Sequence, residues 1–280
     1  MDTWLWASTF GEQHLYCIEE AKKLGAQVID FSINDPFTFP TEAAAALVKK
    51  TELEVVTSTA LPSGCNPISA DKAQRAAAQV FMKKLVDVTA QLGGKVTAGV
   101  NYTASGYLTG KPRTNDEIMR AAEHLYTVAQ YARHKEIVVA VEPVKRFESH
   151  FLNTAQQALE LLDIVNVSNL KVHLDTFHMN IEEASLSEAI LSCGNRLAHM
   201  HLVDSNRGIP GMGHIAWLEI FQALKKIDFN GTACIETFNP QTIEETCAMT
   251  YLTRQFAKTP QELATRGLKY LRAVETMVFE

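Results

Sequence analysis

Short runs of β-branched, apolar residues alternate along the chain with longer segments whose apolar positions repeat every three to four residues. The short runs are typical of buried strands in a parallel sheet, and the longer segments are typical of amphipathic helices that cover it. This alternation predicts repeated strand–helix units in an α/β protein. Strands are expected at residues 3–7, 28–32, 54–58, 95–100, 137–142, 170–175, 197–203 and 232–236.

Several helical segments have recognisable ends. The first helix is expected to stop at Gly25, Thr41 can cap a helix over 42–50, and Asn115 opens a helix that continues to about residue 134. Eight strands and eight helices match a single (β/α)₈ TIM barrel over residues 1–280, because no change in composition marks a linker. The other helices are expected at 71–92, from 153 or 154 onward, at 185–193, at 217–227 and at 261–277.

Composition limits the possible function classes and partners. The 280 residues include 26 Lys and Arg against 32 Asp and Glu, a formal net charge of −6 with no basic patch, which disfavours nucleic acid as a partner. No apolar run approaches the ~20 residues of a membrane span, and the N-terminal residues lack a signal-peptide pattern, so no membrane partner is expected. Five cysteines without a C-x-x-C pair indicate reduced thiols, and we therefore expect a cytoplasmic protein.

Polar side chains end the last four predicted strands, which is where a TIM barrel places its active site. These residues are Glu142, Asp175, His201 and Glu236. The ends of neighbouring strands converge at the mouth of the barrel, so the four side chains can surround one ion. Three carboxylates and one imidazole, without a thiolate, favour Mn²⁺, Mg²⁺ or Co²⁺ over a structural zinc ion.

A single carboxylate or histidine at a strand end often binds only a backbone amide. Four of them in consecutive units are explained together by a metal ion, because buried carboxylates are costly unless they are paired or metal-bound. Two carboxylates on one ion also indicate transfer of a proton from the carbon next to a carbonyl. Return of the proton on the opposite face is epimerisation, whereas return at the neighbouring carbon is aldose–ketose isomerisation, and the spacing fits both.

Three motifs carry a resemblance to a known family. They are residues 141–148 (Val-Glu-Pro-Val-Lys-Arg-Phe-Glu), residues 174–183 (Leu-Asp-Thr-Phe-His-Met-Asn-Ile-Glu-Glu), and the segment from His199 to Arg207. Together they resemble the D-tagatose 3-epimerase (ketose 3-epimerase) family of the xylose-isomerase-like barrels, over about residues 137–238. The resemblance implies inversion of C3 in a free ketose, of the D-tagatose, D-fructose, D-allulose or L-ribulose type, through a cis-enediolate.

The resemblance also implies roles for the four strand-end residues. Glu142 and Glu236 match the paired acid/base residues that also bind the metal, and Asp175 and His201 match the remaining ligands. Members of the family commonly use Mn²⁺ or Co²⁺, and Mn²⁺ is the expected cofactor here. They are usually homodimers or homotetramers that associate through barrel helices, so a homo-oligomer is expected.

Three further positions match the residues that hold the sugar near C1 and C2, namely Glu148, His178 and Arg207. The chain departs from the family pattern elsewhere: Asp30 stands where Glu is usual, and Thr237 follows Glu236 where Pro is usual. The loop 101–107 lacks a tryptophan that often packs on the sugar. The aromatic residues that can line the pocket instead are Trp4, Trp6, Phe10 and Tyr102.

Other functions fit part of the pattern. The enzyme alternatives are aldose–ketose isomerisation and epimerisation of a keto-sugar acid or a keto-glycoside. A DNA-repair endonuclease with three zinc ions needs more histidines at the strand ends and a less acidic surface. A non-catalytic sugar-binding barrel is the contrasting class, and it does not require both Glu142 and Glu236 beside a metal.

Overall fold

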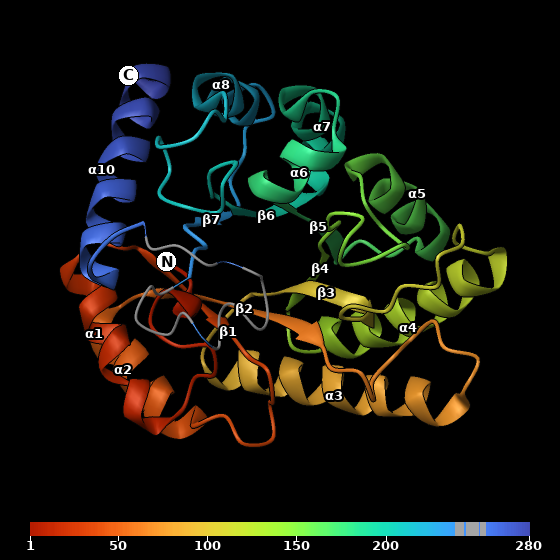
Figure 1. Ribbon diagram of the computed structural model, residues 1–280. Coiled ribbons are helices and arrows are strands. Elements are labelled where there is room, and N and C mark those ends of the chain that lie inside the picture. Colours follow the sequence, from red (N-terminus) through yellow and green to blue (C-terminus); the bar gives the residue numbers. More distant parts are fainter. Residues whose placement is uncertain (239–243, 245–251, 253–255) are drawn as a thin grey trace.

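The computed structural model describes residues 1–238, 244, 252 and 256–280, and it has the predicted TIM-barrel fold, with helices surrounding a parallel sheet (Figure 1). The strands of the described residues follow one another around the sheet in chain order, and each pairs in parallel with the next. They are β1 (Val28–Ser32), β2 (Glu54–Leu61), β3 (Val96–Ala104), β4 (Val138–Val141), β5 (Leu170–Asp175), β6 (Leu197–His201) and β7 (Thr232–Cys234).

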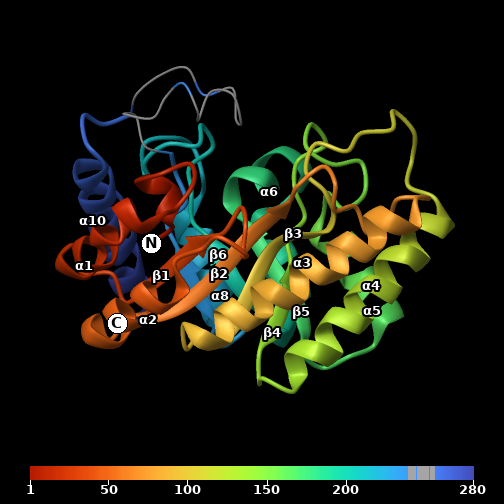
Figure 2. The same ribbon diagram turned by 90° about the horizontal axis from the view of Figure 1, so that it is seen from below.

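Helices cover the outside of the sheet, and Figure 2 shows α1, α2 and α10 gathered on one side and α3, α4 and α5 on the other. The α-helices are α1 (Tyr16–Lys23), α2 (Thr41–Thr51), α3 (Lys72–Gln91), α4 (Asn115–Arg133), α5 (Ala155–Val165), α6 (Thr176–Glu182), α7 (Leu186–Cys193), α8 (Trp217–Lys226) and α10 (Pro260–Phe279). Short 3₁₀ helices are η1 (Thr3–Leu5), η2 (Glu12–His14) and η3 (Gly194–Arg196). Among the described helices, none combines the length and apolar character needed to cross a membrane.

The prediction of a first strand at residues 3–7 is wrong, because this segment begins with the 3₁₀ helix η1. The Asp2 carboxylate accepts a hydrogen bond from the Trp4 amide at 2.6 Å and so starts the helical turn. The backbone of Met1 and Asp2 takes the place of the strand: Asp30 N–H donates to the Met1 carbonyl at 2.9 Å, and Asp2 N–H donates to Ile235 at 3.0 Å. Two residues therefore link β1 to the chain after β7.

Helix α6 was not predicted, and it begins immediately after β5. Asp175 ends the strand and caps the helix, because its Oδ1 accepts hydrogen bonds from the amides of Phe177 at 2.6 Å and His178 at 3.2 Å. The other seven predicted strands are present with small shifts of their ends. A single aspartate thus determines where β5 stops and in which direction the chain continues.

The alternation of side chains along the strands separates an apolar floor from a polar upper layer. Val56, Ala98 and Ala140 belong to a small apolar cluster. Ala140 lies two residues before Glu142, so the two side chains share one face of the chain. Gly99 allows β2 and β3 to approach beside this layer, because its φ is +107° and a Cβ there would lie 2.1 Å from the Thr59 carbonyl oxygen. The polar ends of the strands are thereby brought close together.

Candidate active site

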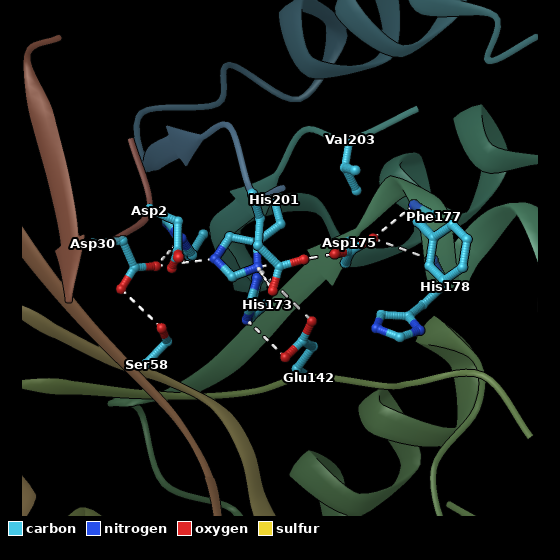
Figure 3. A network of polar contacts seen from close by, with 12 residues as sticks. Asp2, Asp30, Ser58, Glu142, His173, Asp175, Phe177, His178, His201 and Val203 are labelled. Atoms are coloured by element: carbon cyan, nitrogen blue, oxygen red, sulfur yellow. Dashed lines mark hydrogen bonds and ion pairs between the residues drawn. The ribbon is translucent and has the colours of Figure 1, made fainter. Parts of the chain in front are cut away.

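Four strand-end residues meet at the carboxyl end of the barrel, and we call Glu142, Asp175, His201 and Glu236 the carboxylate cluster. All four are buried, at 7% exposure or less. The His201 Nδ1 atom faces all three carboxylates, at 4.0 Å from Glu142 Oε1, 3.9 Å from Asp175 Oδ2 and 3.6 Å from Glu236 Oε1. Figure 3 shows Glu142, Asp175 and His201 pointing toward one another.

Two atoms of the carboxylate cluster have no hydrogen-bonding partner within the part of the chain that the structure describes. They are His201 Nδ1 and Asp175 Oδ2, and both are buried. Glu142, Asp175 and His201 each offer a ligand atom, and these atoms lie within 4.8 Å of one another. Burying unpartnered polar atoms between carboxylates is costly, and a divalent cation removes that cost. The donor set of oxygens and one imidazole fits such an ion.

A second set of polar residues lies on the other side of the His201 ring, and we call Asp30, Ser58, His199 and Thr232 the Asp30 network. Asp30 Oδ2 is 2.9 Å from His201 Nε2 and 3.1 Å from His199 Nε2, and Asp30 Oδ1 accepts a hydrogen bond from the Ser58 hydroxyl at 2.9 Å. His199 Nδ1 is 2.7 Å from the Thr232 hydroxyl. When His201 donates Nε2–H to Asp30, its Nδ1 lone pair is directed at the carboxylate cluster.

The two glutamates of the cluster have opposite pKa shifts. Burial raises the pKa of Glu142 well above its usual value, and the neighbouring charges of Asp175 and Glu236 raise it further. Burial also acts on Glu236, but the charges of Arg207 and His201 outweigh it and lower the pKa of that carboxyl. The two carboxyls of the chain without a metal ion therefore differ in their affinity for a proton.

Arg207 connects this cluster to the outer part of the site. Its Nη2 donates to Glu236 Oε2 at 2.8 Å, and its guanidinium lies over the rings of Phe177 and Phe238, at 4.8 Å and 5.0 Å from their centroids. The Arg207 backbone is left-handed, with φ of +61°. The Thr237 hydroxyl donates to the Arg207 carbonyl at 3.0 Å, so the residue that replaces the usual proline holds this strained position.

His178 and Glu148 lie beside Arg207. His178 Nδ1 accepts a hydrogen bond from the Lys145 amide at 3.1 Å, and its Nε2 is 3.2 Å from Arg207 Nη1 and 4.0 Å from Glu148 Oε2. Burial lowers the pKa of His178 well below its usual value, so the imidazole is neutral. The Lys145 amide and Arg207 Nη1 both donate toward this ring, and a neutral imidazole accepts at only one of its nitrogens.

A cavity of about 190 Å³ opens onto these residues. Its wall includes six of the seven predicted site residues: Glu142, Glu148, His178, His201, Arg207 and Glu236. Of the four aromatic residues expected to line it, only Trp4 does so among the described lining residues, whereas Trp6, Phe10 and Tyr102 belong to the buried core. The wall also includes small polar side chains, namely Ser32, Asn34, Ser58, Thr59 and Ser105, and apolar side chains, namely Ala60, Val100, Val144 and Phe147.

Other residues close to the cluster, among them His173, His199 and Lys145, were not among the predicted site residues. His173 is fully buried, its Nδ1 lies 3.6 Å from Glu142 Oε2, and its two ring nitrogens have no hydrogen-bonding partner among the described residues. His199 and Lys145 contact site residues directly. His173 and His199 each precede a predicted ligand by two positions, and the period of a strand places such residues on the same face. That period was the available signal for both histidines.

The chain was compared with known proteins. The model of the xylose isomerase-like TIM barrel family matches residues 18–274. A probable ketose 3-epimerase from Synechocystis sp. is 32% identical over 275 residues, which cover 96% of this chain and 94% of that protein. An L-ribulose 3-epimerase from Methylomonas sp. is 30% identical over 256 residues, or 91% of this chain and 89% of that protein. The crystal structure of a Methylomonas sp. D-allulose 3-epimerase in complex with D-allulose superposes with a TM-score of 0.90, at 28% identity over 97% of this chain and 95% of that chain.

Proposed function

Because the chain belongs to the xylose isomerase-like TIM barrel family and is a carbohydrate isomerase of the epimerase class, we propose that it is a metal-dependent ketose 3-epimerase. Its substrate is a free ketose of the D-tagatose, D-fructose, D-allulose or L-ribulose type. The observation that carries the proposal is the burial of two glutamates, Glu142 and Glu236, in one cluster with Asp175 and His201.

In the proposed enzyme Glu142, Asp175, His201 and Glu236 hold the divalent ion. Mn²⁺ is the expected ion, with Co²⁺ and Mg²⁺ as alternatives. The buried, unpartnered atoms His201 Nδ1 and Asp175 Oδ2 support a cation at this position. When bound, the ion supplies positive charge that stabilises the negative charge developing on the sugar oxygens at C2 and C3.

Glu142 and Glu236 carry the proton at C3 in the proposed reaction. The ionised glutamate takes the C3 proton, and the electron pair of that C–H bond forms the C2–C3 double bond of a cis-enediolate. The protonated glutamate then returns a proton to C3 from the opposite face, which inverts the carbon. The burial of both glutamates in one cluster supports a two-carboxylate mechanism, and the reverse reaction exchanges their roles.

Glu148, His178 and Arg207 hold the C1 and C2 end of the sugar in this proposal. Glu148 accepts a hydrogen bond from a sugar hydroxyl, and the His178 ring lies beside it in the cavity wall, where it contacts the sugar. Arg207 binds Glu236 and lines the cavity, so it orients one proton carrier while it contacts the substrate. The three side chains fix the ketose so that C3 lies between the two glutamates.

The proposal takes an unmodified monosaccharide as the substrate, and a keto-glycoside or keto-sugar acid is the alternative that a substrate panel tests. Aldose–ketose isomerisation uses the same residues and differs only in the carbon that receives the proton. A non-catalytic sugar-binding role does not require two buried glutamates, Glu142 and Glu236, in one cluster.

We further propose that the enzyme works in the cytoplasm as a homodimer or homotetramer. The resemblance to ketose 3-epimerases supports the oligomer. The described cysteines, Cys17, Cys65, Cys193 and Cys234, are free thiols, as is usual in a reducing compartment, whereas Cys247 lies outside the described residues.

Proton NMR in D₂O tests the proposed function. Purified protein loaded with Mn²⁺ is incubated with D-fructose, D-tagatose, D-allulose or L-ribulose, beside a sample treated with a chelator. We expect metal-dependent incorporation of deuterium at C3 together with the C3 epimer. Deuterium at C1 with an aldose product would change the assignment to aldose–ketose isomerase, and no exchange with any ketose would contradict a free ketose as substrate.

A further inference from the structure

We infer that Lys145 is a positioning residue that holds Glu148 in the orientation in which it binds the sugar. The inference rests on the proposed function, in which Glu148 accepts a hydrogen bond from a hydroxyl near C1. Lys145 lies behind Glu148 and is not among the described lining residues of the cavity, so it acts through the carboxylate.

The loop after β4 brings the two side chains together. Glu148 N–H donates to the Lys145 carbonyl at 2.8 Å, which closes a turn, and the Lys145 ammonium forms an ion pair with Glu148 Oε1. The Lys145 side chain is 16% exposed and that of Glu148 is 35% exposed. The ammonium is therefore the more buried partner, and the carboxylate is the one that faces the cavity.

An aromatic ring fixes the other side of the ammonium. Lys145 Nζ lies 5.3 Å from the centroid of the Phe177 ring, and the Arg207 guanidinium lies 4.8 Å from the same centroid. Phe177 is itself anchored, because its amide donates to Asp175 Oδ1 at 2.6 Å. Lys145 thus joins Glu148 to the start of α6, the helix that also carries His178.

Of the described basic groups near Glu148, Lys145 is the one that forms a charged pair with its carboxylate. His178 is 4.0 Å from Glu148, but its depressed pKa makes it neutral. Arg207 is directed at Glu236, with which it forms an ion pair at 2.8 Å. In the described part of the chain, Lys145 is therefore the cation paired with Glu148, and without it nothing there fixes a half-exposed carboxylate beside the cavity.

The surroundings of the ammonium act on its charge in two directions. Burial, and then the nearby Arg207 charge, lower the pKa of Lys145 to about 8, while the carboxylates of Asp175, Glu236 and Glu142 oppose this shift. The pair therefore rests on its geometry, in which a mostly buried ammonium contacts a half-exposed carboxylate.

A double-mutant cycle tests the inference with the full-length, Mn²⁺-loaded enzyme and the ketose that shows the highest turnover. We expect Lys145→Met to raise KM about tenfold while kcat changes less than about threefold, since the hydroxyl is bound equally in the ground state and the transition state. Glu148→Gln should raise KM by a similar factor. Adding Lys145→Met to Glu148→Gln should have no further effect, because Lys145 acts through that carboxylate.

The matched control is Lys135→Met, which removes a lysine with the same kinds of partner far from the site. Lys135 Nζ lies 3.0 Å from Asp87 Oδ1 and 5.4 Å from the Tyr131 ring centroid. This variant should leave KM and kcat unchanged. Thermal unfolding and Mn²⁺ titration of each variant show whether fold and metal site are intact, and Lys145→Gln carries the same expectation if Lys145→Met does not fold.

The outcomes separate the inference from the proposed function. Wild-type enzyme without metal-dependent exchange at C3 would overturn both. An active wild type whose KM is unchanged by Lys145→Met would overturn the inference alone. Effects of Lys145→Met that are equally large with and without Glu148→Gln would show a general structural role and would also overturn it.

Discussion

The carboxylate cluster and the Asp30 network are both buried and both charged, but they satisfy their polar atoms in opposite ways. Each carboxylate oxygen of Asp30 faces a donor within 3.1 Å, from Ser58, His199 or His201. In the carboxylate cluster, Asp175 Oδ2 and His201 Nδ1 have no hydrogen-bonding partner among the described residues. The first set is complete as the chain folds, whereas the second leaves a buried oxygen and a buried nitrogen that a cation would satisfy.

His201 belongs to the carboxylate cluster and also contacts the Asp30 network, with one ring nitrogen facing each set. Its Nε2 binds Asp30 at 2.9 Å, and its Nδ1 faces the three carboxylates. The contact with Asp30 therefore orients the imidazole when the chain folds, before any ion binds. The difference between the two sets indicates that changes in the cluster affect chemistry and metal binding directly, and that changes in the network act through His201.

The largest effect is expected from Glu236→Gln, which removes a proton carrier and a ligand charge from the cluster. Turnover at C3 should fall at least about a hundredfold, the usual contribution of a general acid or base, and the fold should be retained. Deuterium incorporation at C3 and thermal unfolding measure the two quantities. Glu117→Gln is a matched control, because Glu117 is a buried glutamate in a capping box that glutamine also satisfies. Undiminished exchange in Glu236→Gln would refute a mechanism with two carboxylates.

Asp175→Asn separates the ligand role of this residue from its structural one. Asparagine caps a helix as well as aspartate does, so α6 should be retained. The affinity for Mn²⁺ should nevertheless fall more than about a hundredfold, because the cluster loses one carboxylate. Isothermal titration with Mn²⁺ measures the change, and unchanged affinity would remove Asp175 from the coordination shell.

Asp30→Asn tests the network in the same titration. We expect the affinity for Mn²⁺ to fall about tenfold, less than in Asp175→Asn, because the substitution disturbs only the orientation of His201. Asp71→Asn is the control, since Asp71 is an exposed helix cap of α3 outside the site. A larger loss in Asp30→Asn than in Asp175→Asn would reverse the assignment of the two sets.

Thr237→Val gives the smallest expected effect, because Thr237 contacts the backbone of Arg207 and not the carboxylate cluster itself. It removes the hydrogen bond that holds the left-handed Arg207, and KM should rise about threefold to tenfold. Thr237→Ser keeps the hydroxyl and should behave like the wild type. Steady-state kinetics of the two variants distinguish them, and equal KM values would contradict a positioning role of this hydroxyl.

The same two regions show which features of the site could be predicted from the sequence and which could not. The cluster residues end successive strands, and a TIM barrel places strand ends at one face, so their convergence could be predicted. The contact between His201 and Asp30 joins residues 171 positions apart, and it depends on register and ring orientation that no local pattern encodes. The roles of the predicted site residues are still predictions, although the structure places six of the seven around one cavity.

The prediction of a first strand at residues 3–7 was wrong for a different physical reason. The apolar run that starts at Trp4 has the composition of a strand, but the Asp2 carboxylate caps a helical turn there. Strand propensity is weak evidence when a capping residue precedes the run. The same rule applied to Asp175 would have predicted α6, because an aspartate that follows an apolar strand is also a helix cap.

Anomalous diffraction from crystals of the Mn²⁺-loaded enzyme tests the central claim most directly, since it locates the ion without reference to activity. The account predicts a single peak surrounded by Glu142, Asp175, Glu236 and the Nδ1 atom of His201, with the hydrogen bond between His201 Nε2 and Asp30 intact. A peak within the Asp30 network, or no peak beside the three carboxylates, would contradict it.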